Sequence, residues 1–212
     1  MKTYPINETF LSLQGEGHRA GTVNVFVRFA GCNQTCSIES HGFDCDTEFA
    51  SHVRMTGDDI MAKVGELWQA DAKPNVILTG GEPLLHVDDE LASRLLKECQ
   101  CVAIETNGSL PMPDTMWEAF GPTATSKLFV SCSPKVAEHA VRLQHANEVR
   151  YVRSHGQGIP RPKLDETEWR YLSPAWERGR FEPSALDTCR KLIEENPEWS
   201  LSVQQHKVWS VR

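Results

Sequence analysis

The stretch VNVFVRFAGCNQTCSIESHGFDCDTEF (residues 23–49) is the part of the chain that best reveals the fold. It begins with the nearly continuous apolar run VNVFVRFAG, which predicts a strand buried on both faces of a parallel sheet. Three cysteines follow this strand, Cys32, Cys36 and Cys45, with His41 before the last of them. Because α/β proteins keep their sites at the carboxyl ends of parallel strands, this loop is the first candidate for a functional site.

Similar apolar runs alternate with amphipathic segments along the rest of the chain. The predicted strands are 23–31, 75–81, 101–108, 127–133, 148–152 and 200–206. The predicted helices, in which apolar residues recur about every 3.6 positions, are 58–68, 88–99 and 183–195, with a shorter one at 115–120. This alternation indicates parallel βαβ units. Five or six strands are too few for a closed eight-stranded barrel of about 250 residues, so we expect one domain with an open doubly wound sheet or an incomplete barrel.

Polar and glycine-rich motifs follow four of these strands immediately. They are GCNQTC (31–36), TGGEP (79–83), ETNG (105–108) and SPK (133–135). The carboxyl ends of parallel strands meet at one edge of a sheet, so we expect these motifs to surround one site. The glycines of TGGEP would let a ligand approach the backbone closely, although a tight turn from strand to helix would need glycine as well.

The composition is typical of a globular domain that can bury a substantial core, since 40% of the 212 residues are hydrophobic and 24% are charged. No apolar run approaches the ~18 residues that span a bilayer, and the N-terminal MKTYPINETF lacks the apolar run of a secretory signal. The net charge of −7 and the lack of Lys and Arg clusters argue against direct binding of nucleic acid. We therefore expect a cytoplasmic protein that acts on a small molecule, without a membrane or nucleic-acid partner.

The seven cysteines do not suit a disulfide framework in a cytoplasmic chain, so the group of three indicates metal binding or catalysis. The others lie in periodic segments and are expected to be buried structural thiols: Cys99, Cys101, Cys132 and Cys189. Cys32, Cys36 and Cys45 are spaced C-x3-C and C-x8-C. With His41 they could form a Cys3His zinc site, and without it they could hold an iron–sulfur cluster with one open iron. The spacing alone leaves both interpretations open.

The combination of three cysteines with TGGEP resembles the radical S-adenosylmethionine (SAM) enzymes. Those enzymes hold a [4Fe–4S] cluster on three cysteines and bind SAM at the fourth iron, so the resemblance implies that Cys32, Cys36 and Cys45 bind such a cluster. Their usual spacing is C-x3-C-x2-C, and this chain has six more residues before Cys45. The added residues, within SIESHGF (37–43), indicate a longer loop, which costs only modest additional closure entropy.

The resemblance narrows to the 7-carboxy-7-deazaguanine synthases, on motifs spread over nearly the whole chain. They are FLSLQGEG (10–17), FVRFAGCN (26–33), CDTEF (45–49), TGGEPLL (79–85), AIETNGSLP (103–111), VSCSPK (130–135), NEVRYV (147–152) and WSLSVQQHK (199–207). The segment 153–182 matches poorly, although YLSPAW (171–176) corresponds to that family's last core strand. The family consists of small dimeric radical SAM enzymes of 7-deazapurine (queuosine) biosynthesis. They convert 6-carboxy-5,6,7,8-tetrahydropterin to 7-carboxy-7-deazaguanine and release ammonia.

This resemblance implies an α/β fold, an incomplete (βα)6-type barrel formed by a single domain over 1–212. The domain would contain a cluster loop at 31–49 and a C-terminal segment, 199–212, that covers the substrate. The implied cofactors are one [4Fe–4S] cluster, SAM and Mg²⁺, with Thr47 as the magnesium ligand. A homodimer and a reductase such as flavodoxin or ferredoxin are implied as partners.

The resemblance also implies roles for individual residues. It assigns the catalytic chemistry to the cluster and SAM and no catalytic role to any side chain. The SAM-binding residues would be Gly80, Gly81, Glu82, Glu105, Asn107, Ser133, Pro134, Lys135 and Ser173. The substrate-binding residues would be Leu13, Gln14, Gly15, Glu16, Arg28, Thr79, His206 and Arg212. Arg28 also stands out physically, because a charge inside the apolar run VFVRFAG needs a partner or a functional reason. That partner is either a core carboxylate or the substrate carboxylate, which a guanidinium can hold in bidentate fashion.

Three alternatives to such an enzyme are open. Another small radical SAM enzyme, such as a glycyl-radical activase, would share the cluster loop but should lack LQGEG, VRFAG and the QQHK ending. A non-catalytic zinc-binding module would use Cys32, Cys36, His41 and Cys45 as its ligands. A pterin-binding protein without turnover would need Arg28 and Gln14 but no reducible cluster.

Overall fold

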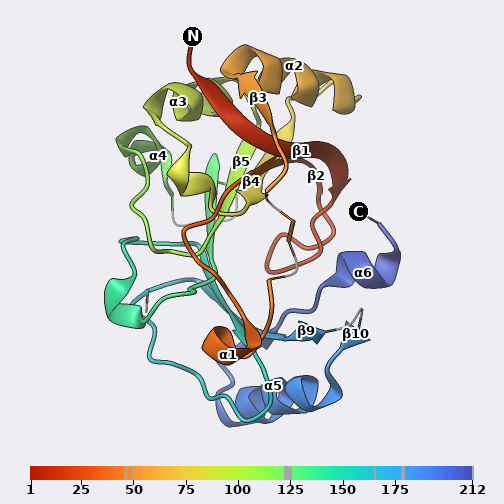
Figure 1. Ribbon diagram of the computed structural model, residues 1–212, viewed down its shortest axis with the longest axis vertical. Helices are drawn as coiled ribbons and strands as arrows, with labels where there is room; N and C mark the ends of the chain where they lie inside the picture. The colour runs from red at the N-terminus through yellow and green to blue at the C-terminus, as the bar shows by residue number, and fades with distance from the viewer. Residues whose placement is uncertain (46, 49, 122–125, 165, 178–179, 212) are drawn as a thin grey trace.

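A nine-stranded sheet forms the centre of the part of the chain that the structure describes (Figure 1). The computed structural model describes residues 1–45, 47–48, 50–121, 126–164, 166–177 and 180–211. The strands lie in the order β11-β8-β7-β6-β5-β4-β2-β1-β3. Their bounds are β1 (Thr3–Leu13), β2 (Val23–Phe29), β3 (Val53–Thr56), β4 (Asn75–Gly80), β5 (Cys101–Thr106), β6 (Leu128–Cys132), β7 (Glu148–Arg153), β8 (Trp169–Pro174) and β11 (Ser200–Leu201). Two short strands, β9 (Trp176–Glu177) and β10 (Arg180–Phe181), pair separately.

The sheet is parallel from β2 to β11, whereas β1 pairs with both β2 and β3 in antiparallel orientation. Within the described residues no pairing joins β11 to β3, so the sheet does not close on itself. The incomplete barrel implied by the sequence is therefore confirmed.

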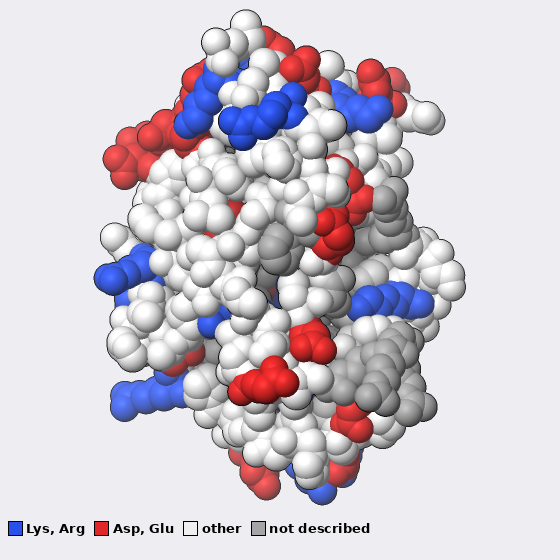
Figure 2. All heavy atoms as spheres, in the orientation of Figure 1, with Lys and Arg blue, Asp and Glu red and all other residues white. Residues whose placement is uncertain are grey.

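Helices α2 (Gly57–Leu67), α3 (Asp89–Glu98), α4 (Asp114–Ala119) and α5 (Pro183–Glu195) cover the outside of this sheet. The other helices are α1 (Ile38–His41) and α6 (Gln205–Trp209), with 3-10 turns η1 (Pro83–Leu85) and η2 (Glu138–Ala140). Helices α2, α3 and α4 lie together near the N-terminus, whereas α5 packs on β7 and β8 at the other end (Figure 1). None of the described helices has the length and apolar composition needed to cross a membrane. On the face seen in Figure 2, the described basic and acidic side chains are mixed.

The two faces of the sheet have different neighbours, as the alternation of side chains in strands requires. Val76 and Leu78 point outward into the main core, which lies under the helices. Between them, Ile77 points inward to a layer that also contains Phe10, Phe26, Ala103 and Phe129. Burial on both faces explains why the strands read as nearly continuous apolar runs.

The inner face changes from apolar to polar toward the carboxyl ends of the strands. Two residues beyond the apolar layer, the same face carries Arg28 on β2, Thr79 on β4, Glu105 on β5 and Ser131 on β6. The pairing register aligns them, because Arg28 lies opposite Thr79 and Glu105 lies opposite Ser131. On β7, Glu148 lies opposite Ser131 and extends the row. This polar layer forms the floor of the candidate site.

Most of the predicted elements are present. Strands β2, β4, β5, β6 and β7 and helices α2, α3, α4 and α5 are confirmed. Strand β8 was not among the strands predicted from the apolar pattern, and it overlaps the segment YLSPAW (171–176), which the resemblance assigns to a core strand. The prediction of a strand over 200–206 is wrong beyond Leu201, because α6 begins at Gln205. The sequence did not predict β1 or β3. In β1 the pairing register shifts between Ile6 and Glu8, so its alternation is interrupted, and Pro5 lowers its strand propensity.

The inserted segment after Cys36 forms more than a loop. It contains the one-turn helix α1, whose N-cap Ser37 forms a capping box with Ser40. The helix ends at Gly42, which has φ +82° and so adopts a backbone conformation that suits glycine. The Gln157 side-chain amide donates to the backbone oxygen of His41 at 3.1 Å and ties this turn to the loop after β7.

Candidate active site

Two cavities lie at the carboxyl ends of the parallel strands, where the sequence predicts that the motifs meet. The first cavity, of about 220 Å³, is bordered by the loops that follow β2, β4, β5 and β6 and by the end of β8. The second cavity, of about 330 Å³, lies between the β1–β2 connection, β2 and the C-terminal segment. Residues that line both are Glu16, Thr47, Thr79, Glu105 and Gln204. The two cavities are therefore adjacent.

Most of the predicted binding residues line one or both of the two cavities. The first cavity is lined by Cys32, Cys36, Cys45, Gly80, Gly81, Glu105, Asn107, Ser133, Lys135 and Ser173. The second is lined by Leu13, Gln14, Gly15, Glu16, Arg28, Thr79 and His206. Thr47, the predicted magnesium ligand, lines both. Glu82 and Pro134 line neither cavity, and Arg212 lies outside the described residues.

The three thiols of the cluster loop border the first cavity as free cysteines. Burial raises the pKa of Cys32 and of Cys36, and the charge of Cys45 would raise each further. Three neighbouring thiolates that repel one another are stabilised by a bound cation, so this donor set fits an iron–sulfur cluster. Among the described residues, no three His, Cys, Asp or Glu side chains are grouped closely enough to hold a metal ion directly. All three thiols line the wall of the first cavity.

His41 does not join the thiols. Its Nδ1 lies 2.7 Å from Ser40 Oγ, and its Nε2 lies 3.0 Å from the backbone oxygen of Lys135. Both ring nitrogens are thus engaged with protein groups, and the residue does not line the first cavity. The geometry gives no support to a Cys3His zinc site.

The glycines of TGGEP permit contact between two strand ends. Gly80 has φ +120°, and a Cβ on Gly81 would lie 1.9 Å from the backbone oxygen of Gly31. The Gly81 N–H donates to Phe29 O at 3.0 Å, and the Glu82 N–H donates to Gly31 O at 2.9 Å. These glycines therefore hold the β4 turn against the start of the cluster loop, in addition to lining the first cavity.

The side chain of Glu82 points into the interior. It is fully buried and accepts hydrogen bonds from Thr106 Oγ1 at 2.8 Å, from the Asn107 N–H at 2.7 Å and from the Leu84 N–H at 3.1 Å. The carboxylate thus joins the turn after β4 to the turn after β5. The structure therefore favours a different role for this side chain than the predicted SAM contact. The carboxylate holds together two turns that line the first cavity.

Glu105 stands at the junction of the cavities and is held by several donors. Thr79 Oγ1 donates to one carboxylate oxygen at 2.7 Å, and Gln14 Nε2 donates to the other at 3.0 Å. The Arg150 guanidinium lies 3.5 Å from it. Burial alone would raise the pKa of Glu105, but the Arg150 charge and these hydrogen bonds outweigh burial and lower it. Glu105 is therefore an ionised acceptor.

The wall formed by SPK and the end of β8 contains polar atoms that face the first cavity. Lys135 Nζ donates to Ser133 Oγ at 2.6 Å, and burial lowers the pKa of Lys135. Ser173 is 5% exposed, and its Oγ has no hydrogen-bond partner among the described residues. A buried hydroxyl without a hydrogen-bond partner is destabilising unless a ligand or a water provides one. The position of Ser173 at the cavity wall therefore indicates that the first cavity binds a polar group.

Arg28 combines the two roles that its sequence position allows. Its Nε donates to Glu8 on β1 at 2.9 Å, so it has a carboxylate partner. Its side chain also lines the second cavity. Beside it, the rings of Phe10 and Phe26 stack with centroids 5.0 Å apart and give the cavity an apolar wall.

The C-terminal segment closes against the β1–β2 connection. The Gln205 N–H donates to the Gly15 backbone oxygen at 2.9 Å, and a Cβ on Gly15 would lie 2.2 Å from His206 Nδ1. Gly15 thus lets His206 reach the second cavity. This contact brings the C-terminal segment against the second cavity.

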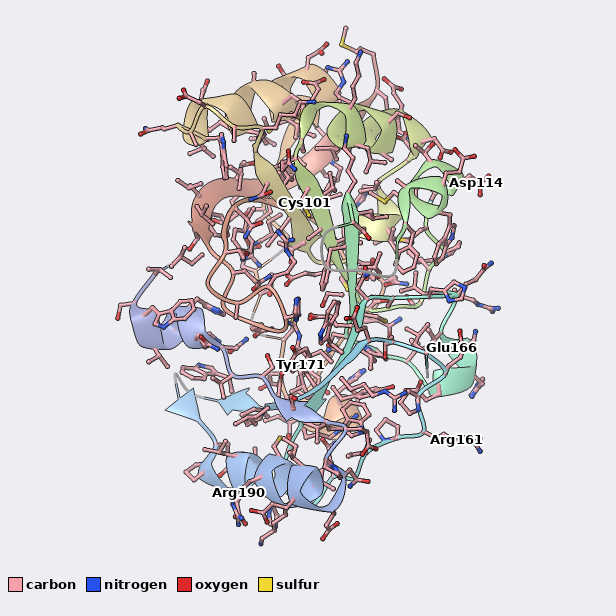
Figure 3. The ribbon with its side chains drawn as sticks, turned by 180° about the vertical axis from the view of Figure 1, so that it is seen from behind. Cys101, Asp114, Arg161, Glu166, Tyr171 and Arg190 are labelled. Atoms are coloured by element: carbon pink, nitrogen blue, oxygen red, sulfur yellow. The ribbon has the colours of Figure 1, made fainter. Side chains whose placement is uncertain are left out.

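The sequence interpretation missed Arg150 and Glu148. Arg150 lines the first cavity, and both side chains are buried among the polar groups at the carboxyl edge. The motif NEVRYV could have indicated both residues, because it places charged side chains inside a predicted buried strand, as VFVRFAG does for Arg28. Cys101, by contrast, begins β5 (Figure 3) and lies at the opposite end of that strand from the cavities, where Arg19 Nη1 donates to its sulfur at 3.2 Å.

Comparisons with known proteins agree with this site. Residues 13–136 match the family described as a 4Fe-4S single cluster domain. The chain is 37% identical over 210 residues to the 7-carboxy-7-deazaguanine synthase of Bacteroides thetaiotaomicron, covering 98% of each chain. It is 32% identical over 234 residues to the synthase of that name from Bradyrhizobium diazoefficiens, covering 99% of this chain and 100% of the relative.

The fold has a solved counterpart as well. The crystal structure of QueE from Escherichia coli superposes with a TM-score of 0.67 at 23% identity, over 95% of this chain and 94% of the other. Together, the matched cluster domain and the full-length relatives place the chain in an iron–sulfur family and exclude the alternative of a zinc-binding module. The chain belongs to the 7-carboxy-7-deazaguanine synthase family of radical SAM enzymes, which carry a [4Fe–4S] cluster and use SAM.

Proposed function

We propose that this protein converts 6-carboxy-5,6,7,8-tetrahydropterin to 7-carboxy-7-deazaguanine with release of ammonia, in 7-deazapurine biosynthesis. The observation that carries the proposal is the pair of adjacent cavities, one beside three thiols and one lined by aromatic rings and an arginine. The names of the full-length relatives support the same reaction.

The residues of the first cavity suit the two cofactors. Cys32, Cys36 and Cys45 would hold the [4Fe–4S] cluster. The residues that would hold SAM are Gly80, Gly81, Glu105, Asn107, Ser133, Lys135 and Ser173. When bound, the cluster and SAM supply the one-electron chemistry that removes a hydrogen atom from the substrate. Thr47 would bind Mg²⁺ at the boundary of the cavities, where the ion could also take substrate oxygens and waters.

The second cavity suits a flat, polar ring with a carboxylate. Phe10 and Phe26 would border the ring, Glu16 would accept from its N–H groups, and Arg28 would bind its carboxylate. The Gln14 amide already accepts from the Glu16 N–H at 3.0 Å and donates to Glu105. Its contribution would therefore be to hold the Glu16 backbone and the Glu105 carboxylate in place beside the ring.

The organisation and partners of the protein are part of the same proposal. Residues 1–212 would act as one radical SAM domain, with 31–49 as the cluster loop and 199–212 as the segment that covers the substrate. The exposed apolar side chains of Val208, Trp209 and Val211 near the C-terminus would suit a homodimer contact. A reductase such as flavodoxin or ferredoxin would reduce the cluster.

The function is tested by turnover with anaerobically purified protein. Iron analysis and a visible spectrum come first, followed by incubation of the reduced protein with SAM, Mg²⁺ and the carboxytetrahydropterin. We expect the deazaguanine acid and ammonia, identified by mass spectrometry and an ammonia assay. Cleavage of SAM without this product would contradict the substrate assignment. A colourless protein with stoichiometric zinc would contradict the radical chemistry.

Arg28→Ala should weaken substrate binding while the iron content stays at the wild-type level. The loss of charge-assisted hydrogen bonds to a carboxylate should raise the KM for the pterin by about tenfold to a hundredfold. The matched control is Glu8→Gln, which removes the charge of the ion-pair partner and leaves Arg28 in place. An equal rise of KM in Glu8→Gln, or loss of iron in Arg28→Ala, would show that the arginine is structural.

A further inference from the structure

Arg150 lies buried among three carboxylates at the polar edge of the sheet. It is 6% exposed, and its Nη1 lies 2.8 Å from Glu16 and 3.8 Å from Glu148, while its Nη2 lies 3.5 Å from Glu105. The carboxylates come from separate elements: the β1–β2 connection, β7 and β5. A guanidinium at this depth requires such partners, because an unpaired buried charge is strongly destabilising.

The three carboxylates have different surroundings. Glu148 has other partners, since it accepts from Ser131 Oγ at 2.6 Å and from the His18 N–H at 2.8 Å. Glu16 and Glu105, by contrast, both line the two cavities. Arg150 therefore joins the only two carboxylates that border both cavities among the described residues. Without a cation, two carboxylates in one desolvated place would repel each other.

We propose that Arg150 is a positioning residue, whose guanidinium holds Glu16 and Glu105 as a fixed pair of acceptors at the junction of the two cavities. This inference rests on the proposed function and deepens it, because it explains how a SAM-side carboxylate and a substrate-side carboxylate keep a constant separation. Arg150 acts through these carboxylates, and the ligands contact the carboxylates.

The planar shape of the guanidinium is essential to this role. Its two terminal nitrogens point in different directions, so one side chain can approach Glu16 and Glu105 together. A lysine ammonium is a single point charge on a flexible stem. Arg150→Lys should therefore keep part of the charge effect and lose much of the fixed geometry, whereas Arg150→Met should lose both.

The test measures ligand binding to the cluster-loaded protein without reductant, so that no turnover occurs. We expect Arg150→Met to raise the dissociation constants of the pterin and of SAM by about tenfold or more, and Arg150→Lys to raise them by less. The matched control is Arg153→Met on the same strand. Arg153 packs against the Tyr151 ring and lines neither cavity, so this variant should keep both constants within about twofold of wild type.

A double-mutant cycle separates positioning from a general structural effect. If Arg150 acts through Glu16, Arg150→Met should add little to the loss of pterin affinity already caused by Glu16→Gln. Fully additive losses, wild-type affinities in Arg150→Met, an equal loss in Arg153→Met, or no recovery in Arg150→Lys would each overturn the proposal. Iron content and thermal unfolding confirm that each variant is folded, and Arg150→Lys serves if Arg150→Met does not fold.

The outcome is distinguishable from failure of the proposed function. Product formation by the wild-type protein decides the function by itself. If the wild-type protein binds SAM but not the pterin, the SAM dissociation constants of the Arg150 variants still test the link to Glu105. Unchanged SAM affinity in Arg150→Met would then overturn the positioning role.

Discussion

Replacement of Cys32, Cys36 or Cys45 by serine should remove most of the bound iron and abolish product formation. Each thiolate would bind a separate iron of the cluster, and His41 is turned away toward Lys135 and Ser40. His41 is therefore not in place to substitute for a missing thiolate. A serine hydroxyl is a harder donor than a thiolate and is protonated at neutral pH, so it does not suit iron–sulfur ligation. We expect activity to fall below detection in all three variants.

The measurement is iron content and visible absorbance after anaerobic reconstitution, together with far-UV circular dichroism. The fold should persist, because Cys32 and Cys36 are only partly buried and Cys45 is exposed. The control is Cys189→Ala, a buried thiol on α5 that packs against β7 and β8 and lines neither cavity. It should keep its iron. A Cys45→Ser variant with full iron and full activity would show that the third ligand has been misassigned.

Glu82→Ala should destabilise the protein by about 3 kcal/mol and also weaken SAM binding. The substitution leaves the Thr106 hydroxyl and the N–H groups of Asn107 and Leu84 without their acceptor, and each buried unsatisfied donor costs about 1–3 kcal/mol. Loss of a buried carboxylate returns part of this cost. The turns after β4 and β5 would separate, and both line the first cavity.

The free energy of unfolding is measured by urea titration of the cluster-free protein, and SAM binding is measured on the loaded protein. Glu66→Ala is the control, since Glu66 is exposed and forms a surface ion pair with Lys63. Its loss should change stability by less than about 0.5 kcal/mol. A Glu82→Ala variant as stable as Glu66→Ala would contradict the assignment of this carboxylate as a clamp.

The cavity residues show how far motif interpretation reaches. The sequence predicted that the ends of β2, β4, β5 and β6 meet at one edge, and they do. Most of the residues expected to bind SAM and substrate line the two adjacent cavities there, although Glu82 and Pro134 do not. The meeting of the strand ends has a simple cause, because parallel strands bring their carboxyl ends together whatever the details of packing. The direction in which a single side chain points could not be predicted from the motifs, as Glu82 illustrates. Its neighbours Gly80 and Gly81 face the cavity, while its own carboxylate turns into the interior.

By itself, the sequence determined the parallel sheet, the helices and the three-thiol loop. The spacing of apolar residues and of cysteines is a local property of the chain, so it can be read without knowing the fold. Only the tertiary structure decided that Arg150 meets Glu16 and Glu105 and that His41 lies away from the thiols. The pairing register explains the difference. It places Arg28 opposite Thr79 and Glu105 opposite Ser131, and a shift of one residue would turn each of these side chains to the other face. Long-range packing fixes that register, and no local pattern specifies it.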